Sequence, residues 1–171
     1  MRKSETEVYT PKSLLTPLDY AYSLLTRRSY AEQELAEKML AKGFTDAAVA
    51  RTVARLKEQG YLNDALLAAD QAERLRQRGF GMERVRAKLR QKGVSPAIIE
   101  RVFASDEPSD ELENARRFLA SRFSPDALKQ PKIVARAFRL LLNRGYSQEV
   151  VEQLLESRLD DAWNSEEEES E

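Results

Sequence analysis

Eight lysine or arginine side chains lie within the nineteen residues from Arg74 to Lys92, where Glu83 is the single acid. So many cations in one segment attract the phosphates of a polyanion or the carboxylates of an acidic protein surface. We predict that this basic segment binds a partner, and its candidate contact residues are Arg74, Arg76, Arg78, Arg84, Arg86, Lys88, Arg90 and Lys92.

The far end of the chain carries the opposite charge. The formal net charge is −1, and the last twelve residues, which begin at Asp160, hold seven acids and no base. Two roles stay open for this acidic tail: it competes with the partner by folding back over the basic segment, or it aids solubility, and we favour solubility.

The residue types give little support to catalysis. The chain has no histidine and no cysteine, which removes the usual nucleophile–base pairs and the usual zinc ligands. Carboxylates fall beside bases at helical spacing, as Asp70 and Arg74 do, and GFG at Gly79–Gly81 lacks the rest of a phosphate loop. We expect no enzyme activity, no catalytic residue, no metal site, no cofactor and no small-molecule substrate.

An internal repeat predicts the elements that position the basic segment. The motifs AKGFT, QKGVS and NRGYS place a glycine after a base at Gly43, Gly93 and Gly145, so the repeat unit is about fifty residues long. Apolar residues recur at a spacing of four on both sides of each glycine, which predicts amphipathic helices that meet there. The aligned apolar positions are Leu35, Val85 and Ala137; Met39, Leu89 and Leu141; Val49, Ile99 and Val151; and Val53, Phe103 and Leu155.

Capping residues mark where the helices begin. Each repeat glycine ends one helix in the left-handed conformation, and the next hydroxyl residue, Thr45, Ser95 or Ser147, caps the following helix. Ser29 with Glu32 predicts a capping box. A further helix precedes each pair, so the fold class is all-α, an elongated array of three tandem three-helix repeats with about nine helices.

The expected domain limits follow from these signals. Residues 1–13 form a disordered N-terminus, 14–62 the first repeat, 63–105 the basic second repeat, 106–162 the third repeat and 163–171 the acidic disordered tail. Because we see no apolar run of about 18–20 residues and no secretion signal, we expect a cytoplasmic protein with no membrane partner. An array with capped ends can function as a monomer, which is the state we expect.

On the helix expected from Met82 to Lys92, the apolar stripe and the charges occupy different sides. Arg84 and Lys88 lie along one flank, and Arg86 and Arg90 lie along the other. Aromatic residues, including Phe80, Tyr61 and Tyr146, fit packing positions, so contacts with nucleic acid would be mostly with phosphates and only weakly specific.

Three stretches carry a resemblance to a known family. SYAEQELAEKMLAKGF, LKEQGYLND and RLRQRGFGMERVRAKLRQKGVS closely resemble the RecX family of regulators of the RecA recombinase. The likeness is strongest over residues 24–103, and RAFRLLLNRGYS from Arg136 is similar to the family's C-terminal region. Leu66 and Leu67 stand where relatives commonly have Arg-Phe.

The resemblance implies a negative regulator that binds the RecA filament on DNA. It would inhibit the ATPase, strand-exchange and filament-extension activities of RecA, and thereby modulate recombinational repair and the SOS response, with at most weak non-specific DNA contacts of its own. The alternative is a stand-alone basic helical DNA-binding module that competes for single-stranded DNA. A third possibility is a helical scaffold for another acidic protein, because phosphates and carboxylates attract the same side chains.

Overall fold

The structure is a computed structural model that describes residues 15–104 and 108–156. Two compact units divide the chain after Leu62. The expected disorder of residues 1–13 and the acidic tail of residues 163–171 lie outside the described residues. The expected boundary between the second and third repeats falls at the gap after residue 104, so the repeat limits stay predictions.

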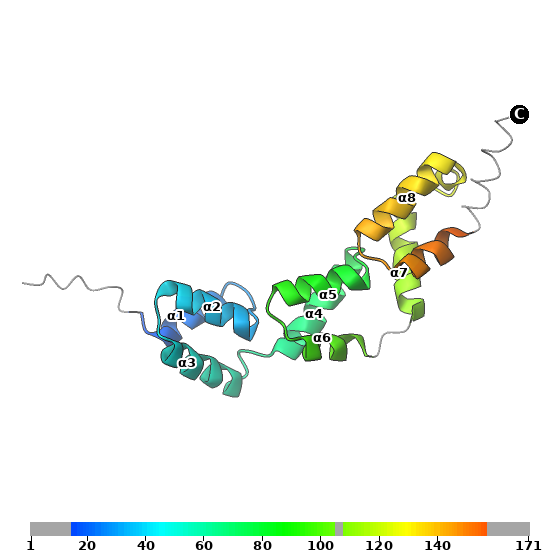
Figure 1. Ribbon diagram of the computed structural model, residues 1–171. Coiled ribbons are helices and arrows are strands. Elements are labelled where there is room, and N and C mark those ends of the chain that lie inside the picture. Colours follow the sequence, from blue (N-terminus) through cyan, green and yellow to red (C-terminus); the bar gives the residue numbers. More distant parts are fainter. Residues whose placement is uncertain (1–14, 105–107, 157–171) are drawn as a thin grey trace, which may run out of the picture. The chain divides into compact units, whose positions relative to one another are not determined.

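The all-α prediction is confirmed for the part of the chain that the structure describes, which contains no strand. None of the helices in these residues is long and apolar enough to cross a membrane. The helices are α1 (Pro17–Leu25), α2 (Glu32–Lys42), α3 (Asp46–Glu58), α4 (Asp64–Gln77), α5 (Met82–Gln91), α6 (Pro96–Phe103), α7 (Pro108–Ala120), the 3-10 helix η1 (Ala127–Lys129) and α8 (Pro131–Asn143), and residues 148–156 are helical as well (Figure 1).

The apolar pattern places the core where the repeat alignment predicts it. Eleven of the twelve aligned positions are buried, and Val53 is half-buried. In the first unit, α1, α2 and α3 pack around Leu35, Met39 and Leu56. Each buried leucine contributes about 1.5–3 kcal/mol to folding, so these stripes stabilise the helices that carry the charges.

The second unit contains two helical groups. Helix α4 packs against α5 and α6, while α7 packs against α8. The core of the second group also includes Val151 and Leu155 from helical residues 148–156, which Figure 1 shows in orange beside α7. Helix η1 was not predicted, and its Leu128 joins the same core.

Most predicted caps are confirmed, and one is wrong. The hydroxyls of Thr45, Ser95 and Ser147 accept hydrogen bonds from backbone N–H groups three residues ahead. The capping box at Ser29 does not form, because α2 begins at Glu32 with Ala31 as its N-cap and no side-chain cap. Glu32 is the first residue of α2, and its carboxylate pairs with Lys57 of α3 at 2.8 Å.

Candidate functional site

The second repeat carries all eight candidate residues of the basic segment. Arg74 and Arg76 lie in the last turn of α4, Arg78 is its C-cap, and Lys92 is the C-cap of α5. The other four, Arg84, Arg86, Lys88 and Arg90, lie on α5 itself. Because α4 packs against α5, the segment becomes one locally folded group, but its cations surround two different aromatic rings.

The first ring belongs to Phe103, at the end of α6. The guanidinium carbons of Arg76 and Arg86 lie 5.0 and 4.4 Å from its centroid, within the range of cation–π attraction. Arg86 also pairs with Glu83 at 3.5 Å and with Glu100 at 3.4 Å, and its side chain is only 23% exposed. We call this group, Arg76 and Arg86 on Phe103, the Phe103 side.

The Phe103 side is tied into its own repeat. Glu100 lies fourteen residues from Arg86 in sequence, so the spacing rules for one helix could not reveal that it neutralises this cation. The Nε of Arg86 is buried and has no hydrogen-bond partner among the described residues. A cation held in this way stabilises α5 against α6 more than it offers charge to a partner.

The second ring belongs to Phe80, in the joint between α4 and α5. The charged groups of Arg78, Lys88 and Arg144 lie 5.8, 5.4 and 4.8 Å from its centroid. Phe80 is half-buried, so three cations gather around a ring that remains near the surface. We call Phe80, Arg78, Lys88 and Arg144 the Phe80 cluster.

Arg144 joins this cluster from the third repeat and was missed by the sequence reasoning. Its guanidinium lies between the rings of Phe80 and Phe118, 4.7 Å from the second, and Nη1 donates a hydrogen bond to the Arg78 carbonyl at 3.1 Å. A signal was present, because Arg144 is the base before the repeat glycine in NRGYS. Only the packing of the second repeat against the third shows where that base lies.

Two glycines bring these repeats into backbone contact. The Gly81 N–H donates to the Arg144 carbonyl at 3.0 Å, and the Glu83 N–H donates to the Gly145 carbonyl at 3.1 Å. A Cβ added at Gly81 would lie 2.2 Å from the Tyr146 nitrogen, which leaves no room for a side chain. Glycine at this position therefore permits the close approach that places Arg144 on Phe80.

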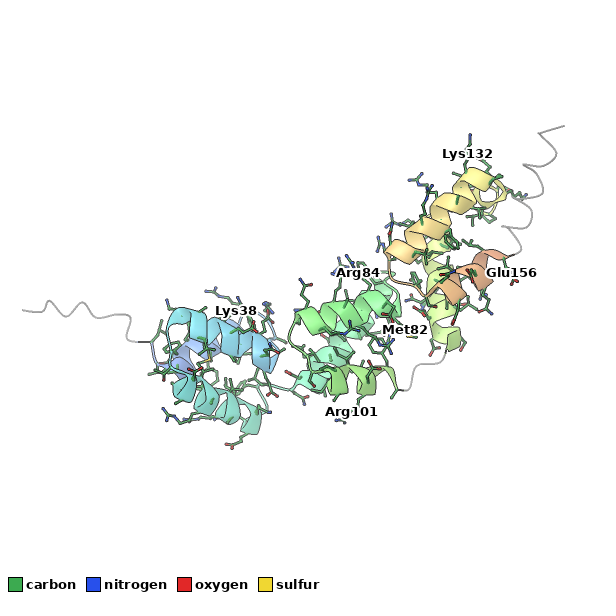
Figure 2. The ribbon with its side chains drawn as sticks, in the orientation of Figure 1. Lys38, Met82, Arg84, Arg101, Lys132 and Glu156 are labelled. Atoms are coloured by element: carbon green, nitrogen blue, oxygen red, sulfur yellow. The ribbon has the colours of Figure 1, made fainter. Side chains whose placement is uncertain are left out.

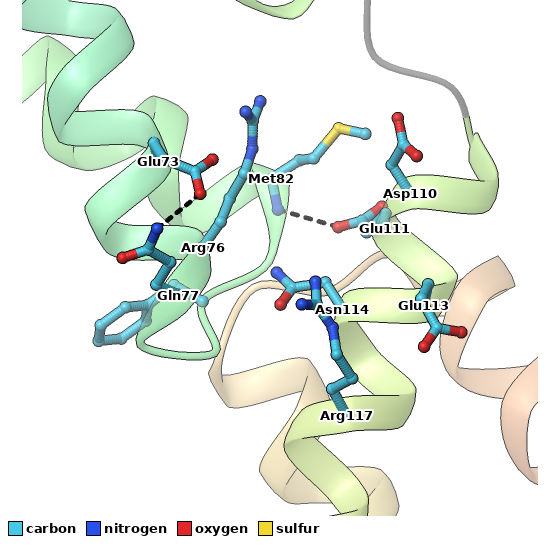
Figure 3. Close-up of a pocket in the computed structure, with 10 residues that line it drawn as sticks. Glu73, Arg76, Gln77, Met82, Asp110, Glu111, Glu113, Asn114 and Arg117 are labelled. Carbon is cyan, nitrogen blue, oxygen red and sulfur yellow. Dashed lines mark hydrogen bonds between the residues drawn. The ribbon is translucent and has the colours of Figure 1, made fainter.

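Glu111 completes this junction by capping α5 from the third repeat. The N-cap of α5, Gly81, has no side chain, and the Met82 N–H donates instead to Glu111 Oε1 at 2.9 Å (Figure 3). Glu111 is 8% exposed, and burial raises the pKa of its carboxyl although hydrogen bonds with Met82 and Ser147 oppose the rise. A carboxylate at a helix N-terminus also meets the positive end of the helix dipole.

A cleft of about 380 Å³ opens beside this cap, between α4 and α7. Figure 3 shows acidic and basic side chains facing one another across it, among them Glu73, Arg76 and Arg117. No group of three or more potential metal-binding side chains occurs in residues 15–104 and 108–156. Phe80 also lines this cleft, so one part of its surroundings carries mixed charge, while the cations of the Phe80 cluster rest on its ring.

The remaining candidates are open to solvent. Arg84 and Arg90 are exposed and Lys92 is half-buried, and none of these three forms an ion pair within the described residues. Arg74 pairs with Asp70 at 3.0 Å, as the spacing predicts, but both side chains are about half exposed or more. Figure 2 shows Arg84 on α5 and Arg101 on α6, projecting from opposite sides of the second repeat.

The aromatic predictions were partly wrong. Phe103 and Tyr146 are buried as expected, but Tyr61 is 58% exposed and makes an edge-on contact with Tyr22. Burial raises the pKa of Tyr146 to about 12, with the nearby Glu111 charge as a second cause. Phe80 packs as predicted, and it also serves as the base on which three cations rest.

Fold and site together define a helical repeat protein that carries a basic patch supported by the Phe80 ring. The model for the first three-helix domain of RecX matches residues 18–56, and the model for the second three-helix domain of RecX matches residues 63–102. The chain belongs to the RecX family of regulatory proteins.

Relatives of known name agree with this assignment. The chain is 32% identical over 143 residues to "Regulatory protein RecX" of Vibrio vulnificus, covering 84% of this chain and 92% of that protein. It is 35% identical over 141 residues to the protein of the same name from Trichlorobacter lovleyi, covering 80% and 91%.

Solved structures support the fold. The RecX crystal structure from Lactobacillus salivarius superposes with a TM-score of 0.69 at 15% identity, over 84% of this chain and 94% of that one. A second crystal structure of regulatory protein RecX gives 0.66 at 20% identity, over 82% and 72%.

Proposed function

We propose that this protein is a non-enzymatic negative regulator of the RecA recombinase that binds the RecA filament on DNA. In this account it inhibits the ATPase, strand-exchange and filament-extension activities of RecA. By that route it modulates recombinational repair and the SOS response. Membership of the RecX family of regulatory proteins supports the assignment of RecA as the target.

The observation that carries the proposal is the Phe80 cluster. Its three cations come from two repeats, and Arg78, Lys88 and Arg144 form no ion pair with a carboxylate in the part of the chain that the structure describes. Side chains already held on a ring lose less freedom when a partner binds, so more of the electrostatic attraction becomes affinity. Exposed Arg84 and Arg90 extend the positive surface along α5.

The Phe103 side has a different role in this proposal. Glu83 and Glu100 pair with Arg86, and Phe103 anchors both of its cations, so we assign Arg76 and Arg86 to the packing of the second repeat. The contact residues of the basic segment then reduce to Arg74, Arg78, Arg84, Lys88, Arg90 and Lys92, joined by Arg144.

The proposal is tested by binding at near-physiological salt to three targets in parallel. These are a RecA filament on single-stranded DNA, the same DNA without RecA, and free RecA. We expect a strong preference for the filament, together with inhibition of its ATP hydrolysis. Equal or tighter binding to the naked strand would contradict the proposal and would favour the stand-alone DNA-binding module, which lowers RecA activity by competing for the strand.

A further inference from the structure

Helix α8 presents a second basic surface that lies outside the predicted basic segment. At 100° per residue, Lys132, Arg136, Arg139 and Asn143 fall within about 60° of one another around the helix axis. All four side chains are exposed. We call these four residues the α8 stripe, and Figure 2 shows Lys132 projecting outward from one end of it.

The stripe is separated from the core by the geometry of the helix. Val134, Ala137 and Leu141 lie on the opposite side of α8 and are buried, and Ala137 and Leu141 share a core with α7 and helical residues 148–156. Because the apolar face is already covered, α8 cannot insert that face into a membrane or a hydrophobic groove. The charged side remains available for a partner.

The charge of the stripe has no counterion in the described residues. Neither α8 nor its flanking residues contain an acid from Ala127 to Gln148. Lys132, Arg136 and Arg139 form no hydrogen bond or ion pair within residues 15–104 and 108–156, whereas neighbouring Lys129 pairs with Asp126 at 2.8 Å. Three unpaired cations therefore lie along about 10 Å of helix.

We propose that the α8 stripe binds the phosphodiester backbone of nucleic acid. Protein interfaces depend on buried aromatic or apolar anchors, but the stripe contains only cations and one amide, and the large apolar side chain exposed on the same helix, Leu142, is 38% exposed. Cations and an amide suffice to hold phosphates, which are contacted by arginine, lysine and asparagine. The interaction is electrostatic, independent of base sequence and sensitive to salt.

This inference goes beyond the proposed function and does not rest on it. The Phe80 cluster is assigned to the filament, whereas the stripe would bind nucleic acid that carries no recombinase. The two surfaces share no residue, although Arg144 of the Phe80 cluster directly follows Asn143 of the stripe, so they can be changed separately. A test on naked nucleic acid therefore leaves the filament proposal standing if the stripe fails.

The experiment measures the affinity of the full chain for a labelled single strand and its duplex, by fluorescence anisotropy over a series of salt concentrations. The double variant Arg136→Gln with Arg139→Gln removes two phosphate contacts. The slope of log affinity against log salt should become shallower by about 1.4 on the single strand and about 1.8 on the duplex.

Two matched variants control for charge and folding. Arg51→Gln with Arg55→Gln removes two exposed arginines from α3 and should leave the slope unchanged. Arg136→Lys with Arg139→Lys keeps the charge and should keep the wild-type slope. Helical circular dichroism checks that every variant is folded.

Three outcomes would overturn the inference. The wild-type chain could fail to bind naked nucleic acid even at low salt, or the Arg136→Gln, Arg139→Gln variant could keep the wild-type slope. If the Arg136→Gln, Arg139→Gln variant binds naked strands normally but loses affinity for the RecA filament, the stripe binds an acidic protein surface instead.

Discussion

The two aromatic rings of the second repeat hold their cations for different purposes. Phe103 is 6% exposed and supports Arg76 and Arg86, and Arg86 is also neutralised by acids of its own repeat. Phe80 is half-buried and supports Arg78, Lys88 and Arg144, for which the described residues provide no acid. The cations of the basic segment look equivalent in the sequence, but the structure divides them into one group that stabilises the repeat and another that is open to a partner.

The division arises from what lies next to each ring. On the Phe103 side, α6 supplies Glu100 and the ring itself, so the contacts stay within one repeat. At Phe80, the neighbour is the loop that carries Gly145, and the third repeat adds the cation Arg144, while its Glu111 is engaged with the Met82 N–H. The variants below either remove contacts at one of the two rings and leave the other ring unchanged, or measure how much each set of contacts contributes to stability.

The largest effect is expected at the glycine junction that brings Arg144 to Phe80. Gly81→Ala forces a Cβ to within 2.2 Å of a backbone nitrogen, so the repeats must separate, and the free energy of unfolding should fall by about 3 kcal/mol. Gly43→Ala is the matched control, since its Cβ meets nothing within 4 Å and only its φ of 100° is strained. It should cost about 1 kcal/mol.

Urea denaturation followed by circular dichroism distinguishes these two variants. Equal losses of stability would mean that the contact between the second and third repeats does not hold the Phe80 cluster together.

Arg144→Gln tests the cluster without disturbing the backbone. The variant loses two cation–π contacts and a charged hydrogen bond to the Arg78 carbonyl, so the free energy of unfolding should fall by about 2 kcal/mol. Arg144→Lys keeps the charge but loses the planar donor, and it should recover only part of the loss. Urea denaturation measures both, and a Gln variant as stable as the wild type would contradict the assigned contacts.

Arg86→Gln should affect stability slightly and filament binding not at all. The ring contact and the two ion pairs are lost, but a buried Nε without a partner is removed at the same time. We expect a decrease of about 1 kcal/mol in the free energy of unfolding, with unchanged affinity for the filament. A clear loss of filament affinity in this folded variant would mean that the Phe103 side belongs to the binding surface.

The smallest effect is expected from Glu111→Gln and depends on pH. Burial raises the folded-state pKa of Glu111 above its unfolded value, so its contribution to stability is fully present below the unfolded pKa and is lost as pH rises through the folded one. Glutamine cannot ionise and still offers an oxygen to the Met82 N–H. The variant should therefore gain stability relative to the wild type as pH rises above the ordinary glutamate pKa of about 4.3, as measured by urea denaturation at each pH. A constant difference would contradict this assignment.

Much of the fold could be predicted because its signals are local. The repeat glycines, the apolar stripes at a spacing of four and the hydroxyl caps each involve residues within one turn or two. Positions such as Leu89 and Ile99 are buried as the alignment predicts. The capping box at Ser29 does not form because α2 begins at Glu32, and the Glu32 carboxylate pairs with Lys57 from another helix, a contact that local spacing does not reveal.

The candidate site was only partly predictable because its decisive contacts join distant residues. Arg144 reaches the Arg78 carbonyl across 66 residues, and Glu111 reaches Met82 across 29. A helical wheel separates the flanks of α5 correctly, but it contains no information about which helix covers each flank. The acid that neutralises Arg86 and the cation that joins Phe80 lie on neighbouring elements, so a helical wheel of α5 could not identify them.

The central claim is that the Phe80 cluster and the adjoining face of α5 bind the RecA filament. Its most direct test compares wild type, Arg84→Glu with Lys88→Glu, and the control Arg51→Glu with Arg55→Glu in filament binding and inhibition of filament ATPase. We predict that the first variant loses at least about tenfold in affinity, or about 1.4 kcal/mol, and abolishes inhibition with its helicity intact, while the control behaves as wild type. Full inhibition by the folded Arg84→Glu, Lys88→Glu variant would contradict the account.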